Sequence, residues 1–263
     1  MRFDHAILAV RDLQAARSDF HELGFTSVYG GQHSGGLTHN ALIAFADGSY
    51  LELMAPTDPA HLTARPGEGY LYVFQRGEGF AGYALHTEDL EAAVDGMRLR
   101  GLPIGEPATG GRRREDGQEL AWRMATLPEG MSPFFLEDVT PRELRVPDRP
   151  EATTHANGAL GAAGLVVLVA DLEQANVRYR AILGQTPEPG TWMPGAATAD
   201  YSVGGCRISL AAPESSGGEL AAELQRRGEG PYRLSLRIGS GQPAGLLDPA
   251  KTHGGEVALV GVG

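Results

Sequence analysis

A short segment that occurs three times along the chain constrains the fold most. It begins with Asp-Leu, is rich in alanine, and occupies residues 12–16, 89–93 and 171–175. Each copy follows an apolar or alternating run that is typical of a β-strand. Recurrence of the same pattern at an interval of roughly 80 residues indicates repeated supersecondary units.

Each copy also predicts the start of a helix. The aspartate occupies the N-cap position, where a short polar side chain accepts hydrogen bonds from backbone amides that have no partner within the helix. Leu13, Ala16 and Phe20 then recur at helical spacing and predict a buried face. Gly24 provides a helix-ending residue, and glycines follow the other two segments at similar distances.

Strand patterns complete each unit. In the first unit, Asp47-Gly48 is a strong tight-hairpin signal between two of the predicted strands. The predicted strands span residues 25–30, 41–46 and 49–54 in the first unit, 83–87, 102–104, 120–127 and 134–137 in the second, and 165–169, 199–203 and 207–210 in the third. A degenerate fourth copy is expected from a helix at 219–227 and a strand at 232–238.

These patterns predict an α+β fold built from tandem βαβββ modules. We expect a first domain over residues 1–139, which holds two modules and the functional site. Residues 140–158 are rich in Pro, Thr and charge and lack apolar periodicity, so they are predicted to be a linker. A second domain over residues 159–263 would contain the degenerate last module.

The composition of the chain indicates which classes of binding partner and which cellular location to expect. Hydrophobic residues make up 42% of the chain and charged residues 21%, as in a packed globular protein. The formal net charge of −11 argues against nucleic acid as a partner. No segment has the roughly 20 apolar residues of a membrane span, and no signal sequence precedes the first strand pattern. We therefore expect a cytoplasmic protein with a small-molecule ligand.

The reactive side chains exclude two further classes of site. Cys206 is the only cysteine, so neither an internal disulfide nor a zinc site of several thiolates can form within one chain. Lys251 is the only lysine and lies near the end of the sequence, which argues against Schiff-base chemistry. Any metal ion must therefore rely on histidines and carboxylates.

At this point the sequence resembles the vicinal-oxygen-chelate superfamily, which includes glyoxalase I, bleomycin-resistance proteins, extradiol dioxygenases and methylmalonyl-CoA epimerase. The resemblance rests on His5 to Asp12 and on Asp47 to Leu53. Within that superfamily, residues 30–33, 36–40 and 50–53 look like those of the glyoxalase-like domains. Beyond residue 150 the resemblance is to the generic module alone.

The resemblance implies a metal site. Strand alternation places His5 and Glu52 on the faces opposite the helix layer. In the superfamily the modules form half-barrels whose inner faces line a pocket, and the positions of His5 and Glu52 match the metal ligands of the first and fourth strands. A site of His5, Glu52 and His86 would suit Fe, Mn, Zn, Ni or Co. Such an ion would act as a Lewis acid on a substrate with adjacent oxygens.

The second module matches this pattern less well. The position equivalent to His5 is Gly82, which has no ligand atom, and His86 is therefore a displaced candidate. The position equivalent to Glu52 is Phe134, with Glu137 nearby. Under the metal hypothesis, Glu137 or His39 is the predicted proton-transfer base.

Two glycine-rich segments remain open to alternatives. Residues 30–36 do not have phosphate-loop spacing, and they are interpreted as a flexible loop or as a lid from which His33, His39 and Asn40 contact a ligand. Residues 112–114, a run of three arginines, are predicted to lie in an exposed hairpin loop, with an anchor for a substrate carboxylate as the alternative.

Two functions from different classes follow from the first domain. The first is a metal-dependent lyase, isomerase or dioxygenase that acts on a small molecule with vicinal oxygens. The second is a metal-free binding protein that sequesters a small molecule, as bleomycin-resistance relatives do. The third module has Gly164 and Ser209 at the ligand positions, so the C-terminal half is expected to complete the fold or to form a homodimer.

Overall fold

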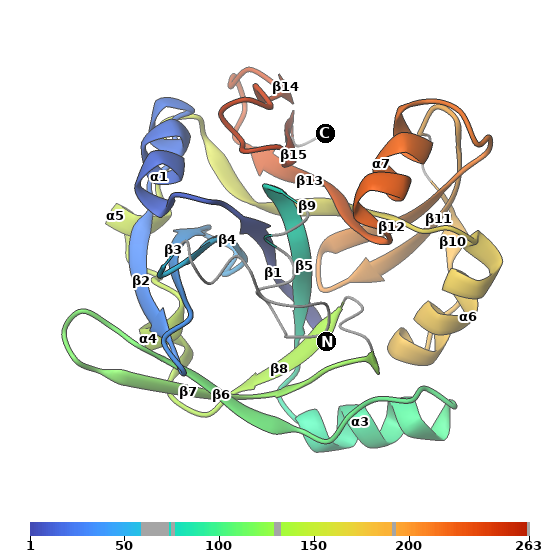
Figure 1. Ribbon diagram of the computed structural model, residues 1–263, viewed down its shortest axis with the longest axis horizontal. Helices are drawn as coiled ribbons and strands as arrows, with labels where there is room; N and C mark the ends of the chain where they lie inside the picture. The colour runs from blue at the N-terminus through green and yellow to red at the C-terminus, as the bar shows by residue number, and fades with distance from the viewer. Residues whose placement is uncertain (59–73, 75–76, 129–132, 191–192, 262–263) are drawn as a thin grey trace.

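Two β-sheets follow one another along the chain in the computed structural model, and helices cover their outer faces (Figure 1). The structure describes residues 1–58, 74, 77–128, 133–190 and 193–261. The N-terminal sheet is a closed barrel, and the C-terminal sheet is open with seven strands. The predicted mixed α+β fold is confirmed.

Eight strands close the barrel in the order β1-β4-β3-β2-β6-β7-β8-β5. β1 pairs in parallel with β4, and it pairs antiparallel with β5, which begins the second half of the barrel. The pairing of β2 with β6 closes the other seam. The strands are β1 (Arg2–Ala9), β2 (Val28–His33), β3 (Thr38–Ala44), β4 (Tyr50–Pro56), β5 (Gly79–His86), β6 (Ala108–Arg113), β7 (Glu119–Ala125) and β8 (Phe134–Asp138).

The open sheet has the order β10-β11-β12-β9-β13-β15-β14. Its strands are β9 (Ala159–Leu168), β10 (Glu188–Pro189), β11 (Ala196–Val203), β12 (Cys206–Pro213), β13 (Gly230–Ile238), β14 (Gly245–Leu246) and β15 (Glu256–Gly261). The helices are α1 (Leu13–Glu22), α3 (Leu90–Leu99), α4 (Arg142–Arg145), α5 (Pro150–Thr153), α6 (Leu172–Leu183) and α7 (Glu219–Arg227).

The three predicted N-caps are confirmed. Asp12 accepts hydrogen bonds from the amides of Gln14 and Ala15 at 2.8 and 3.0 Å. Asp89 and Asp171 cap α3 and α6 in the same way. Local sequence therefore fixes where these helices begin, and the buried apolar residues of each helix face the sheets.

The two faces of β1 point to different surroundings, the main core on one side and the barrel interior on the other. Ala6 and Leu8 pack with α1 in the main core, which continues into the C-terminal sheet. Ile7 and Ala9 belong to a separate apolar cluster with Met54 of β4, inside the barrel. Strand alternation therefore places residues as predicted from Ala6 onward.

A β-bulge interrupts that alternation at the start of β1. The register with β5 shifts between Phe3 and His5, and both Phe3 and Ala6 lie in the outer core. Asp4 and His5 between them therefore both turn toward the barrel interior. Bulges redirect side chains in this way, and they are frequent beside functional sites.

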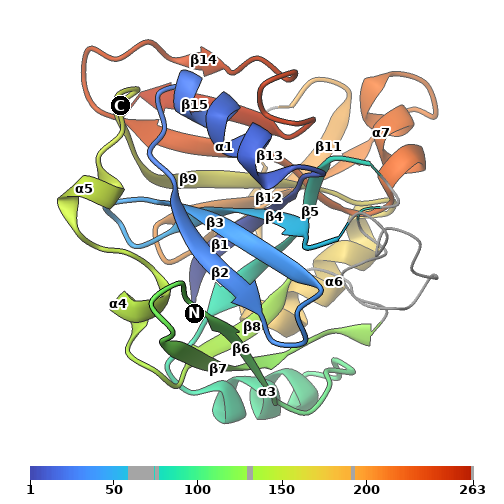
Figure 2. The same cartoon turned by 60° about the vertical axis from the view of Figure 1, so that its left-hand side comes forward.

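The segment 140–158, predicted to be a linker, forms α4 and α5, which lie beside the barrel in both ribbon views (Figures 1 and 2). His155 accepts a hydrogen bond from the amide of Thr26 at 3.0 Å. The side chain of Arg145 is buried in the barrel, and Val146 packs against Leu42 of β3. This connection therefore also covers one end of the barrel.

Three local predictions are wrong. Residues 102–104 are not a strand, because Pro103 has no amide to donate; β6 begins instead at Ala108. The glycine-rich segment from residue 30 is not a loop up to His33, because Gly30 and Gly31 continue β2. Arg112 does not lie in an exposed hairpin loop; it is a buried residue of β6, and the turn follows it.

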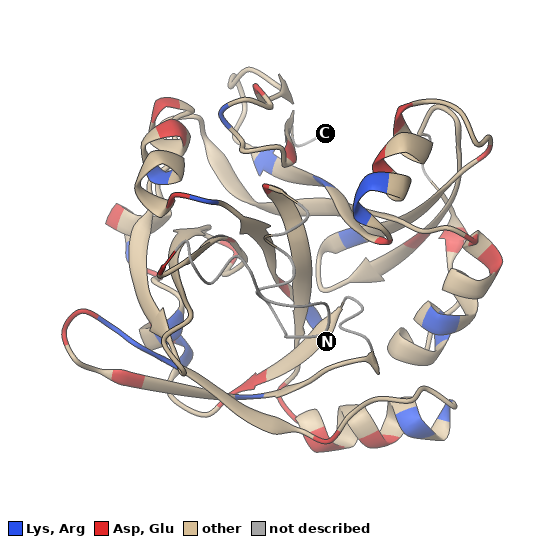
Figure 3. Ribbon diagram, in the orientation of Figure 1, with Lys and Arg blue, Asp and Glu red and all other residues tan. Residues whose placement is uncertain are grey.

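Helices α3, α6 and α7 each carry both signs of charge. Figure 3 shows acidic residues in the first part of each of these helices and arginines in the last part. In the described ranges, no helix is long and apolar enough to span a membrane.

Candidate functional site

The barrel interior carries its polar side chains in layers along β1 and the parallel strand β4. Asp4 and His5 lie nearest the end covered by α4, and Ile7 and Ala9 follow toward the other end. The register pairs His5 with Tyr50 and Ile7 with Glu52. The polar layer of His5 and Glu52 thus borders an apolar layer of Ile7, Ala9 and Met54.

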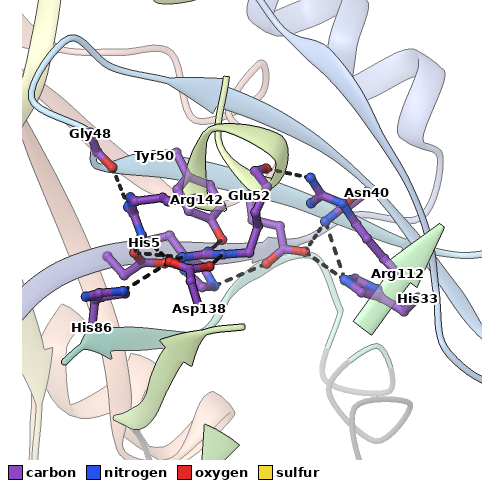
Figure 4. A network of polar contacts seen from close by, with 12 residues as sticks. His5, His33, Asn40, Gly48, Tyr50, Glu52, His86, Arg112, Asp138 and Arg142 are labelled. Atoms are coloured by element: carbon purple, nitrogen blue, oxygen red, sulfur yellow. Dashed lines mark hydrogen bonds and ion pairs between the residues drawn. The ribbon is translucent and has the colours of Figure 1, made fainter. Parts of the chain in front are cut away.

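Glu52 is the centre of the polar layer. Its Oε2 lies 3.3 Å from Nε2 of His5, and its Oε1 accepts a hydrogen bond from Nδ2 of Asn40 at 2.6 Å. Nε2 of His33 lies 3.4 Å from the same Oε1. Figure 4 shows Glu52 directed at His5 on one side and at Asn40 and His33 on the other. The structure therefore brings together four of the predicted site residues.

His5 is held between two carboxylates. Its Nδ1 lies 2.8 Å from Oδ2 of Asp4, while its Nε2 faces Glu52. The ring of Tyr50 stacks on it at a centroid distance of 4.3 Å. Burial lowers the pKa of His5, but hydrogen bonds to Asp4 and Glu52 outweigh this effect and raise the pKa above its ordinary value.

Below this layer lies a network of two aspartates and two arginines. Arg145 donates to Asp4 at 2.9 Å, to the Tyr50 hydroxyl at 2.9 Å and to both oxygens of Asp138. Nη1 of Arg142 lies 2.6 Å from Asp4 and 3.3 Å from Asp138. Burial alone would raise the pKa of Asp4, but Arg145, His5 and Arg142 hold it well below its usual range. Both aspartates are therefore ionised and paired.

Sequence reasoning missed this network. Asp138 shares a strand face with Phe134 and Leu136, so alternation along β8 was a usable signal. Asp4 carried no signal in a regular strand pattern, because it turns inward through the bulge. Arg145 lay in a polar, aperiodic segment whose composition predicts exposure.

Arg112 is a further buried cation beside this cluster. It lies opposite His33 in the pairing of β2 with β6, and its residue is 5% exposed. Its Nη2 donates to the backbone carbonyl of Arg145 at 2.6 Å. Among the described residues, neither Nε of Arg112 nor Oδ1 of Asn40 has a hydrogen-bond partner.

The other predicted site residues lie elsewhere. His86 faces inward, but at the end of β5 its Nε2 lies 3.0 Å from Asp138 instead of beside Glu52. Glu137 is on the outer face of β8, where it accepts a hydrogen bond from the amide of Leu90 at 3.2 Å. His39 lines an outer cleft of about 760 Å³ beside α1. The structure does not bring these three residues to the His5 and Glu52 cluster.

A divalent metal does not fit the donor arrangement. Across β1, the residues that face His5 from the second half of the barrel are Ala84 and, through the β5–β8 register, Phe134. Neither of these two residues supplies a ligand atom. Among the described residues, no group of three or more His, Cys, Asp or Glu side chains is arranged to hold a metal ion.

Comparison with models of known protein families shows to which family the chain belongs. A family model for the glyoxalase-like domain matches residues 3–183. The chain belongs to the glyoxalase-like domain family. No curated protein sequence matches it significantly. The family match covers the whole barrel and the first strand and helix of the C-terminal sheet.

Solved structures share the fold of this glyoxalase-like chain at low sequence identity. A hypothetical protein from Staphylococcus aureus aligns with a TM-score of 0.74 and 13% identity over 99% of both chains. A mutant of 4-hydroxymandelate synthase from Streptomyces coelicolor aligns with a TM-score of 0.57 and 15% identity over 91% of this chain and 72% of that one. At these identities the likenesses show a shared fold. The family match agrees with the glyoxalase-like resemblance noted from the sequence.

Proposed function

We propose that the barrel binds a small oxygenated molecule and acts on it through side-chain hydrogen bonds and proton transfer, without a divalent metal held by the protein. The observation that carries this proposal is the position of His5. It is flanked by Asp4 at 2.8 Å and Glu52 at 3.3 Å, and it faces Ala84 and Phe134 where a second pair of metal ligands would be needed.

The interior is suited to a ligand with one polar end. His33 is the most accessible member of the cluster, with 22% of its side chain exposed, while Glu52 has 6%. Apolar residues of the neighbouring layer, Ile7, Met54 and Phe74, offer a surface for the rest of the molecule. A mostly apolar site with few convergent polar groups is typical of small-molecule pockets.

The cluster also has the parts for proton transfer. His33 Nδ1 lies 2.8 Å from the Thr38 hydroxyl, and its Nε2 lies near Glu52. A histidine oriented by a neighbouring hydroxyl and a carboxylate is a common general acid or base. His33 thus takes the proton-transfer role in this proposal, in place of Glu137 and His39.

A ligand screen in the presence of EDTA tests the proposal. Thermal stability would be measured against a panel of small acids, alcohols and carbonyl compounds. A ligand present at 100 times its Kd stabilises the folded state by about 2.7 kcal/mol. The expected hits keep their effect in EDTA and lose it in Glu52→Gln. Hits that require an added divalent metal would contradict the metal-free site.

A further inference from the structure

Arg112 differs from Arg142 and Arg145, the other arginines of the network, because it has no carboxylate partner at ion-pair distance among the described residues. Asp4 and Asp138 are paired with Arg142 and Arg145. Glu52 faces His5, whose pKa is raised by its two carboxylate neighbours. In the described part of the chain, no carboxylate oxygen lies within ion-pair distance of Arg112.

An unpaired guanidinium in this position is costly. Arginine stays protonated in proteins, and a buried charge without a partner destabilises the folded state. Arg112 is 5% exposed, and within the described ranges its side chain makes one hydrogen bond, to the Arg145 carbonyl. The pKa of Arg112 is lowered, chiefly by burial, although Tyr50 and Glu52 oppose this shift from a distance. The fold therefore buries a guanidinium that has no direct ion-pair partner in the part of the chain that the structure describes.

A buried acceptor without a partner accompanies this cation. Asn40 is 1% exposed, and its Nδ2 is committed to Glu52, which leaves Oδ1 without a donor. Both Asn40 Oδ1 and Arg112 Nη1 lie beside Gly30, where an added Cβ would be 2.1 Å from the amide oxygen and 3.1 Å from the guanidinium nitrogen. The unused acceptor and the unused donors thus occur side by side, and Figure 4 shows both residues at the same end of the network.

We propose that Arg112 and Asn40 recognise a small carboxylate that carries a hydroxyl group next to it. The Arg112 guanidinium donates to the ligand carboxylate, and the ligand hydroxyl donates to Asn40 Oδ1. This inference rests on the proposed function and names its substrate class, a 2-hydroxy acid. Charge-assisted hydrogen bonds from arginine to carboxylates are strong and geometrically selective.

The test uses matched small probes on the full chain. Glycolate carries both recognised groups, acetate lacks the hydroxyl, and glycolamide lacks the charge. Glycolate at about ten times its Kd is expected to raise Tm by about 3–5 °C. Acetate should bind more weakly than glycolate, and glycolamide should give no shift. Equal shifts for glycolate and glycolamide, or none for either, would overturn the inference.

Variants separate recognition from folding. In Arg112→Met the Tm without ligand should stay unchanged or rise, because an unpaired buried charge is removed, while glycolate affinity falls at least tenfold. Arg113→Met, on the exposed neighbouring position of β6, is the matched control and should bind glycolate normally. If Arg112→Met does not fold, Arg112→Lys keeps the charge and should weaken glycolate binding through loss of the guanidinium geometry.

The outcomes for this inference and for the proposed function are distinguishable. If uncharged molecules bind in EDTA and depend on Glu52 while carboxylates do not bind, the anion inference fails and the proposed function stands. If glycolate binds only with an added divalent metal, the proposed function fails. A large loss of Tm in Arg112→Met with unchanged glycolate affinity would make Arg112 a structural residue and overturn the inference.

Discussion

Arg145→Met is expected to destabilise the fold strongly, although the residue comes from a segment whose composition predicts a linker. The Arg145 side chain is 3% exposed and holds Asp4, which is fully buried. Breaking a buried ion pair by removing one partner costs about 3–5 kcal/mol. Arg142 remains 2.6 Å from Asp4, so we expect the lower end of that range, about 3 kcal/mol.

Urea unfolding at two pH values measures this cost and its origin. The pKa of Asp4 and the pKa of Asp138 are lowered in the folded state, so their contribution is present above their unfolded values and is lost as pH falls through the folded values. Without Arg145 both pKa values rise. The difference in the free energy of unfolding between variant and native protein should therefore shrink at acid pH. Arg226→Met, which removes an exposed pair with Glu223, should cost less than about 0.5 kcal/mol.

Two results would refute this reasoning. A loss of less than about 1 kcal/mol in the free energy of unfolding of Arg145→Met at pH 7 would mean that Arg145 does not hold a buried charge. A loss that stays constant down to acid pH would mean that packing, and not ionisation of Asp4 and Asp138, explains the effect.

Three further predictions concern other parts of the barrel. Gly30→Ala should cost about 2 kcal/mol in urea unfolding, because its Cβ would lie 2.1 Å from Asn40 Oδ1; a neutral effect would contradict the close packing. Asp12→Ala should cost about 1 kcal/mol through loss of the α1 cap, and an unchanged Tm would argue against the cap. The pKa of His5 should lie above 6.5 in an NMR titration, so its contribution is complete below that pH and is lost as pH rises through the folded pKa; a value at or below 6.5 would refute the two-carboxylate environment.

Local patterns were sufficient for much of the fold. The helices begin at Asp12, Asp89 and Asp171 because capping and helical periodicity are properties of neighbouring residues. Strand alternation also placed His5 and Glu52 on the inward face, since β1 is regular from His5 onward and β4 is regular over its whole length. The resemblance to a known superfamily supplied the expectation of half-barrels, and in the structure the first eight strands form one closed barrel.

The remaining site residues depend on contacts that alternation does not encode. Asp4 faces inward because of a bulge whose position is set by the pairing with β5. Arg145 becomes buried because the chain after β8 returns across the barrel end, although its neighbours in sequence are polar. Arg112 follows a glycine pair in a run of arginines that resembles a loop, and only its pairing with β2 buries it.

The metal content of purified, untagged protein shows whether the barrel holds a divalent ion. The protein would be reconstituted separately with Fe(II), Mn, Zn, Ni and Co, freed of excess ion, and analysed beside Glu52→Ala. We expect far less than one ion per chain for every metal, with no difference in metal content between native protein and variant. About one ion per chain, lost in Glu52→Ala, would contradict this expectation and would identify His5, His33 and Glu52 as ligands.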